Sequence, residues 1–279
     1  MGKIYKMNSN KNLIFAVTHG RTGTTMVTEV FKIFDNVRSE HEPEPNYASV
    51  FPHVKSDPRN AIKFLEKKLS TIDSFDEENY IETSNVFGKG FLIPLLRMGR
   101  MPGLLFLNRD FRETARSLYV RGSIPVRSKM GRHFSADPSV PGSLPIFSPE
   151  SLSDYQMCFW GVLDSYYRQL QAESVYKKEG GCYCWVNASD FHDFEKAVSI
   201  GSTFGLGVSD KEYAKKMHSE IVGVHHNPNK GKRNTSEVSA FSEEIEVIDR
   251  VAFYDPEFVE SCLSSKYLSS DVVSYLRQD

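Results

Sequence analysis

The chain has 279 residues and a formal net charge of −2, because 34 Lys and Arg stand against 36 Asp and Glu. This balance argues against a broad basic surface that binds nucleic acid. The sequence also contains no run of about 18 apolar residues, so no membrane span is predicted. With 40% hydrophobic and 12% aromatic residues, residues 1–279 are predicted to form one large α/β domain.

The first predicted elements are a strand and a helix joined by a turn with two glycines. Residues 13–17 (LIFAV) form a short apolar run typical of a buried strand, and residues 26–34 (MVTEVFKIF) have the apolar side of a helix. The turn, residues 18–25, reads THGRTGTT. Its glycines allow close backbone approach, its threonines offer hydroxyls, and Arg21 adds positive charge. We expect an anion-binding loop; the alternative is an ordinary tight turn.

This loop differs from two common phosphate-binding motifs. A nucleoside triphosphatase loop has lysine after its second glycine, whereas Gly23 is followed by Thr24 and no glycine lies five residues before it. A dinucleotide fingerprint is also absent, because Gly20 and Gly23 have no third glycine in place. We therefore expect neither the magnesium-binding machinery of such enzymes nor any other metal site.

Three glutamates alternate in residues 39–45 (SEHEPEP), which follow a short predicted strand at 36–38. In an extended segment Glu40, Glu42 and Glu44 would face the same side. Three carboxylates together would favour a cationic or amine-bearing partner. The alternative is a solvated loop stiffened by proline.

A second anion site is predicted near the middle of the chain. Residues 102–110 have the pattern of a buried strand and residues 111–119 that of a helix. Arg109 lies at the strand's end, and Ser117 follows about two helical turns later. Because parallel strands present their carboxyl ends at one edge, Arg109 and the 20–25 loop are expected to face one crevice.

Residues 121–150 are rich in Pro, Ser and Gly and show no clear periodicity. A loop this long is usually functional or disordered. We predict a variable lid over an acceptor site; the alternative is a floppy insertion. Helices are expected at 152–176, 243–254 and 269–277, and a strand at 182–186.

The four cysteines are Cys158, Cys182, Cys184 and Cys262. Their spacing is not a zinc signature, so we expect buried, reduced thiols. Together with an N-terminus that lacks a long apolar signal core, this favours a cytoplasmic protein.

In order and spacing these motifs resemble those of sulfotransferases that use 3′-phosphoadenosine 5′-phosphosulfate (PAPS). The 20–25 loop resembles their 5′-phosphosulfate loop, with Arg21 where the family has lysine or arginine. Arg109 and Ser117 resemble the family's 3′-phosphate pair. Residues 229–233 (NKGKR) resemble the late basic segment that closes over that phosphate, although Asn229 stands where arginine is common and no Gly-Asp-Trp follows. Residues 187–191 resemble the segment that borders the adenine.

The resemblance implies a three-layer α/β fold in which helices flank a mostly parallel sheet, the P-loop-like sulfotransferase architecture. It implies PAPS as donor, 3′-phosphoadenosine 5′-phosphate (PAP) as product, and a hydroxyl or amine of a metabolite or natural product as acceptor. The implied cofactor-binding residues are Arg21, Thr22, Gly23, Thr24, Thr25, Met26, Arg109, Ser117, Lys230, Gly231 and Lys232.

Two other functions stay open, a carbohydrate sulfotransferase and a nucleotide-binding protein without catalysis. We expect no nucleic-acid or membrane partner, and the sequence leaves homo-oligomer formation open.

Sulfuryl transfer also needs a general base. The resemblance to carbohydrate and tyrosyl sulfotransferases makes Glu42 the first candidate. His41 is the second, because imidazole titrates near neutrality. Glu82 is the third, since the cytosolic members place a catalytic histidine near that later strand and this chain has none there. Arg21 would stabilise the departing phosphate.

Overall fold

The computed structural model describes residues 11–224 and 240–278. Its strands form one sheet in the order β2-β3-β1-β4-β5, and every neighbouring pair is parallel. The strands are β1 (Asn12–Thr18), β2 (Val37–Glu40), β3 (Asn79–Glu82), β4 (Gly103–Asn108) and β5 (Tyr183–Asn187). The predicted α/β class with a parallel sheet flanked by helices is confirmed at this level.

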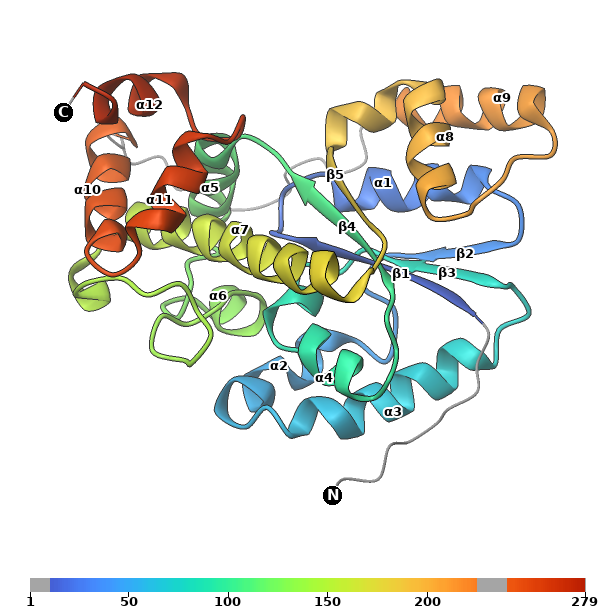
Figure 1. Cartoon of the computed structure of the whole chain (residues 1–279), viewed down its shortest axis with the longest axis horizontal. Helices are drawn as coiled ribbons and strands as arrows, with labels where there is room; N and C mark the ends of the chain where they lie inside the picture. The colour runs from blue at the N-terminus through green and yellow to red at the C-terminus, as the bar shows by residue number, and fades with distance from the viewer. Residues whose placement is uncertain (1–10, 225–239, 279) are drawn as a thin grey trace.

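Helices cover both faces of the sheet (Figure 1). In β1, Leu13, Phe15 and Val17 pack toward one face, while Ile14 packs toward the other. A strand covered on both sides needs apolar residues at every position, which is why β1 and β4 read as continuous apolar runs rather than alternating ones.

Three groups of helices surround the sheet. One face is covered by α1 (Thr24–Val30), α8 (Phe194–Thr203) and α9 (Lys211–Val222). The other is covered by α2 (Tyr47–Ser56), α3 (Asn60–Asp73), α4 (Leu92–Arg97) and the C-terminal part of α7 (Asp154–Glu179). The rest of α7 packs against α5 (Phe111–Arg121), α10 (Ala240–Ala252), α11 (Pro256–Leu263) and α12 (Ser270–Leu276). Within the described ranges, no helix is both long and apolar enough to cross a membrane.

Residues 121–150 are packed against the rest of the domain. They contain the helix α6 (Lys129–Phe134), which begins where the Ser128 hydroxyl accepts a hydrogen bond from the Gly131 N–H. Leu144 is fully buried in the core beside α7. Gly131 allows close packing, because a Cβ there would lie 1.7 Å from the Ile124 carbonyl oxygen.

The cysteines follow the prediction only in part. Cys158 and Cys262 are buried, but Cys184 is half-buried and Cys182 is exposed. Cys182 directly precedes β5, which is an edge strand of the sheet formed by the described residues. The expectation of a buried thiol is therefore wrong for Cys182.

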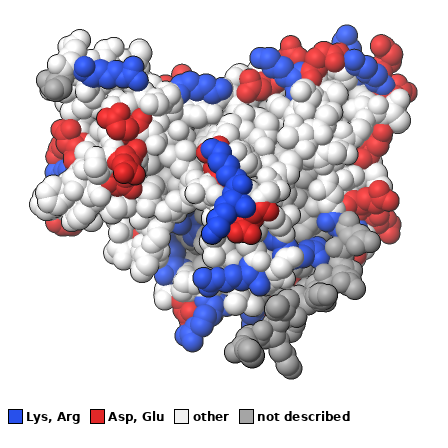
Figure 2. All heavy atoms as spheres, viewed as in Figure 1, with Lys and Arg blue, Asp and Glu red and all other residues white. Residues whose placement is uncertain are grey.

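Acidic and basic side chains both occur in small groups on the face of the molecule that Figure 2 shows. No large area of one sign dominates this face. Solvation and solubility are the ordinary roles of such mixed surface charge.

A buried ion pair fixes the loop after β2. Lys68 Nζ of α3 lies 2.8 Å from Glu82 Oε2 at the end of β3, and both side chains are almost inaccessible to solvent. Lys68 also donates to the carbonyls of Pro43 and Pro45, and the Tyr80 hydroxyl donates to Glu82. Burial raises the Glu82 pKa to about 7, against the opposing effect of Lys68. Glu82 is thus a structural partner of the 41–46 loop.

Replacing one partner of this pair should cost more than replacing both. We expect Lys68→Met to lower the free energy of unfolding by about 3–5 kcal/mol, because the Glu82 carboxyl group and the Pro43 and Pro45 carbonyls would stay buried without this partner. Lys68→Met combined with Glu82→Gln should recover part of that loss. Urea denaturation measures both values, and a double variant that is no more stable than the single one would contradict the coupling.

Candidate functional site

A cavity with a volume of about 1020 Å³ lies at the carboxyl edge of the sheet. Its walls come from the segments that follow β1, β2, β3 and β4. The chain leaves β1 toward β2 and β3 on one side and reaches β4 on the other, so the crevice between β1 and β4 is a topological switch point. Ligands of open α/β sheets bind at such points.

The loop after β1 is held in a strained, well-anchored shape. Arg21 and Gly23 have φ angles of +77° and +91°, a conformation that a non-glycine residue adopts at a cost of roughly 1–3 kcal/mol. A Cβ on Gly23 would lie 2.8 Å from the Cβ of Ala188. The Thr18 hydroxyl lies 2.6 Å from that of Thr22 and donates to the Leu107 carbonyl of β4. The loop is therefore tied to the neighbouring strand.

Most of the predicted donor-binding residues meet in this cavity. Those that line it are Arg21, Gly23, Thr24, Thr25, Met26, Arg109 and Ser117. Thr22 differs, because its side chain is buried and its hydroxyl donates to the His19 carbonyl. Lys230, Gly231 and Lys232 lie outside the described residues.

Arg21 connects the two predicted anion sites directly. Its Nε donates to the Ser117 hydroxyl of α5 at 3.0 Å. Burial, Arg121 and Arg109 together lower the pKa of Arg21 from its usual value, as expected where cations converge. Arg109 makes an ion pair of 2.7 Å with Glu113, and both side chains are about half exposed.

A smaller cavity of about 420 Å³ adjoins the first. Arg109, Glu113 and Ala188 line both. The smaller cavity also reaches Asn187 and Tyr267, at the end of β5 and in the chain between α11 and α12. The 187–191 segment, predicted to border an adenine, therefore lines a hollow next to Arg109.

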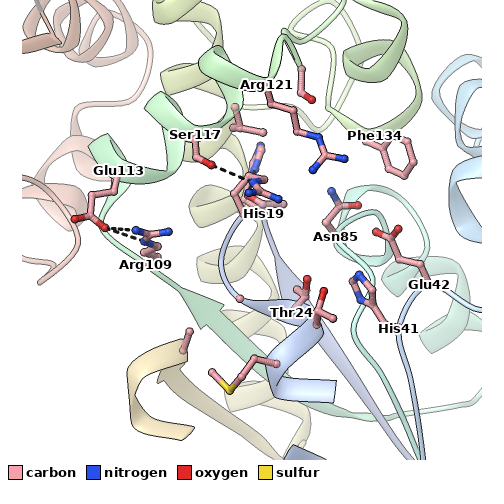
Figure 3. Close-up of a pocket in the computed structure, with 18 of the residues that line it drawn as sticks. His19, Thr24, His41, Glu42, Asn85, Arg109, Glu113, Ser117, Arg121 and Phe134 are labelled. Carbon is pink, nitrogen blue, oxygen red and sulfur yellow. Dashed lines mark hydrogen bonds and ion pairs between the residues drawn. The ribbon is translucent and has the colours of Figure 1, made fainter. Parts of the chain in front are cut away.

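Two of the three candidate bases line the large cavity. His41 and Glu42 lie on the side opposite Arg109 (Figure 3). His41 Nδ1 lies 2.9 Å from the Thr83 carbonyl oxygen. A carbonyl only accepts, so Nδ1 carries the hydrogen and Nε2 keeps a lone pair that can take a proton. Glu82, buried against Lys68, lines neither cavity.

The expected row of three glutamates is not present. The strand β2 ends at Glu40, whose carboxylate pairs with Arg38 at 2.7 Å. The chain then turns, with a φ of +48° at Glu42, and Glu44 accepts a hydrogen bond from the Asn46 N–H. Among these glutamates Glu42 alone lines the cavity. The prediction failed because it assumed a continuous extended segment.

Two buried bases near the cavity were not predicted. His19 is fully buried, and burial, with Lys89 nearby, lowers its pKa to about 3. His19 is therefore neutral near pH 7, and it lines the cavity. Its Nε2 has no hydrogen-bond partner among the described residues. Lys89, in the short 3₁₀ turn Phe87–Lys89, has its pKa lowered to about 7, mainly by burial. His19 could have been found from its place in the THGRTGTT loop; Lys89 has no sequence signal.

Two lysines hold α6 against the cavity. Lys89 Nζ donates to the Phe134 carbonyl at 2.7 Å, and Lys55 Nζ donates to the Arg132 and Ser135 carbonyls. Cations satisfy the free carbonyls at a helix C-terminus well. These hydrogen bonds hold the end of α6, where the Phe134 side chain lines the cavity. The predicted role of the 121–150 segment in lining a site therefore has a structural basis in α6.

No group of three His, Cys, Asp or Glu side chains in residues 11–224 and 240–278 is arranged to hold a metal ion. No protein-family model matches the chain, and no curated protein matches it in sequence. Functional conclusions therefore depend on the two cavities and on the residues that line them.

Lys89 should make stability depend on pH above neutrality. Its pKa is about 7 in the folded protein and near 10.4 when unfolded. Between these values the unfolded state binds more protons, so the free energy of unfolding rises with pH, by up to about 1.4 kcal/mol per pH unit. Urea denaturation from pH 7 to 9 should show this slope, and Lys89→Met should remove it. Equal slopes in the two proteins would contradict the assignment.

Proposed function

We propose that this chain is a PAPS-dependent sulfotransferase that acts on a hydroxyl or amine of a small molecule. One observation carries the proposal: the 20–25 loop and the Arg109–Ser117 pair share one cavity and are joined by the Arg21–Ser117 hydrogen bond. Two linked cationic positions at the switch point of a parallel sheet suit a nucleotide with phosphates at two places. The P-loop-like sulfotransferase architecture is part of this proposal.

The donor would lie with its 5′-phosphosulfate on the 20–25 loop. There the backbone N–H groups from Thr22 to Met26 and the Arg21 guanidinium would bind the phosphate oxygens. The 3′-phosphate would bind Arg109 and Ser117; the further residues that the resemblance implies, Lys230, Gly231 and Lys232, lie outside the described part of the chain. Arg109 can exchange its present partner Glu113 for a phosphate, because an ion pair this exposed contributes only about 0–1 kcal/mol.

In the reaction an acceptor oxygen or nitrogen attacks the sulfur as the bond from sulfur to the bridging oxygen breaks. The electron pair of that bond stays on the 5′-phosphate, which leaves as PAP, and the acceptor proton passes to the base. Such a transfer is accelerated by positioning and by charge stabilisation. Arg21 would supply the fixed charge next to the departing oxygen.

Glu42 is our first choice of base and His41 the second. Both line the cavity on the side away from Arg109, where an acceptor would lie in line with the sulfur. The free Nε2 of His41 and the carboxylate of Glu42 are each able to accept a proton. Kinetics on single variants can separate them.

Nucleotide binding tests the donor site. PAP should raise the melting temperature of the protein, whereas ATP and NAD should not, because neither carries a 3′-phosphate on the adenosine ribose. Arg109→Ala should weaken PAP binding about 10–100-fold, the usual effect of losing a charged hydrogen bond. Arg97→Ala, an exposed arginine of α4 that lines neither cavity, is the matched control. Equal stabilisation by ATP and PAP would refute the proposal.

Turnover tests the base. Glu42→Gln should lower kcat by about 10²–10⁴-fold, as measured by transfer of radiolabelled sulfate to a panel of hydroxy and amino metabolites. The affinity for PAP should stay unchanged in the binding experiment. Glu44→Gln, two residues away and outside the cavity lining, should keep full activity. A loss confined to His41→Gln would move the role to His41. Tight PAP binding without transfer to any acceptor, including sugars, would indicate a nucleotide-binding protein without catalysis.

A further inference from the structure

One face of α5 runs along the whole cavity. Glu113, Ser117 and Arg121 lie four residues apart on it, and all three line the cavity. Residues at this spacing share a helix face, and each step advances about 6 Å along the axis. The face therefore leads from the Arg109–Glu113 pair, past Arg21 at Ser117, to Arg121 one turn farther on.

Arg121 has no role at the donor site as proposed above. Its guanidinium points into the cavity, toward Asn85 and Phe134, on the side where Glu42 and His41 lie (Figure 3). In the described part of the chain no hydrogen bond or ion pair to Arg121 is present, although many other arginines, such as Arg112 and Arg168, are paired with carboxylates. A cation directed into a cavity without a carboxylate partner is a ready binding position for an anion.

The neighbouring wall is apolar. Met130 and Phe134 of α6 line the same cavity, and the Lys55 and Lys89 hydrogen bonds to the carbonyls at the end of α6 fix this wall. An apolar body packed there would lie between the guanidinium and the candidate bases. Ligand pockets combine apolar contact with a few oriented polar groups in this way.

Resting on the proposed function, we infer that the acceptor is a carboxylic acid. Its carboxylate pairs with Arg121, its apolar body contacts Phe134 and Met130, and its hydroxyl or amine lies beside Glu42 and His41. A guanidinium fork matches a carboxylate with two parallel hydrogen bonds. The expectation of a cationic acceptor depended on three aligned glutamates, of which only Glu42 lines the cavity.

Binding and turnover of matched acceptors test this inference. The panel contains aromatic and aliphatic hydroxy acids, each with its methyl ester. One set has a hydroxyphenyl scaffold and also includes an amine: para-hydroxyphenylacetate, its methyl ester and tyramine. For at least one acid we expect the Kd from calorimetry and the acceptor KM to be at least about 10-fold lower than those of its ester. The failure of every acid to outperform its ester would overturn the inference, as would a preference for tyramine.

Variants separate recognition of the acceptor from other roles of Arg121. Arg121→Gln should raise the KM of the preferred acid about 10–100-fold, with little change for its ester and none in PAP affinity. Arg121→Lys should restore part of the loss, and Lys129→Gln, exposed and outside the cavity lining, should change nothing. Weaker PAP binding in Arg121→Gln would show that Arg121 contacts the sulfuryl donor. Lower thermal stability with an unchanged KM would show that Arg121 only stabilises the C-terminal end of α5. Either result overturns the inference.

The binding arm distinguishes the two proposals, because calorimetry of the acid needs no donor. Acid binding that depends on Arg121 in a protein that does not bind PAP would refute the sulfotransferase proposal and leave the acidic ligand in place. PAP binding that depends on Arg109, with no acid bound more tightly than its ester, would refute only the acidic acceptor.

Discussion

The parallel pairing of β1 with β3 on one side and β4 on the other is the constraint on which the rest of this structure depends. Parallel strands end at one edge and neighbouring strands lie about 5 Å apart, so the segments that leave them begin side by side along that edge. The loop after β1, Glu42 beyond β2, Asn85 beyond β3 and Arg109 at the end of β4 therefore reach one cavity. Their sequence separations of tens of residues have no bearing on this proximity.

Buried polar groups then fix what the sheet brings together. Gln169 of α7 donates to the Val17 carbonyl and accepts from the Asn108 side chain, which joins β1 to β4 just below the cavity. Lys68, paired with Glu82, also holds the carbonyls of Pro43 and Pro45, which follow Glu42 in the chain. Such groups are costly to bury unless each finds a partner. The hydrogen bonds of Gln169 and Lys68 tie the loops around the cavity to the sheet and to α3, and a preorganised site loses little entropy when it binds.

The same helix face contributes to both halves of the proposed reaction. On α5, Ser117 contacts Arg21 at the donor side, and Arg121 extends toward Phe134 at the acceptor side. A rigid helix sets the distance between these two positions, so the donor and the acceptor would be aligned by one element. Lys55 and Lys89 hold the end of the wall that α6 forms. If the proposed reaction is right, α6 would therefore be the element through which the choice of acceptor changes most readily.

The sequence by itself determined the strand–loop–helix at residues 12–30 and the parallel α/β class, because continuous apolar runs and glycine turns are local signals of buried strands. Local patterns pointed to Arg21 and Arg109 as anion-binding residues, and the resemblance to sulfotransferases added the roles of Ser117, His41 and Glu42; all five line the cavity. Only the tertiary structure decided that Glu40 and Glu44 lie outside the cavity lining, that Glu82 pairs with Lys68, that Lys89 is buried against the end of α6, and that Arg121 lines the cavity. These outcomes depend on burial and on contacts between residues far apart in the chain. No local pattern encodes them, because desolvation and pairing are set by the three-dimensional surroundings of a side chain.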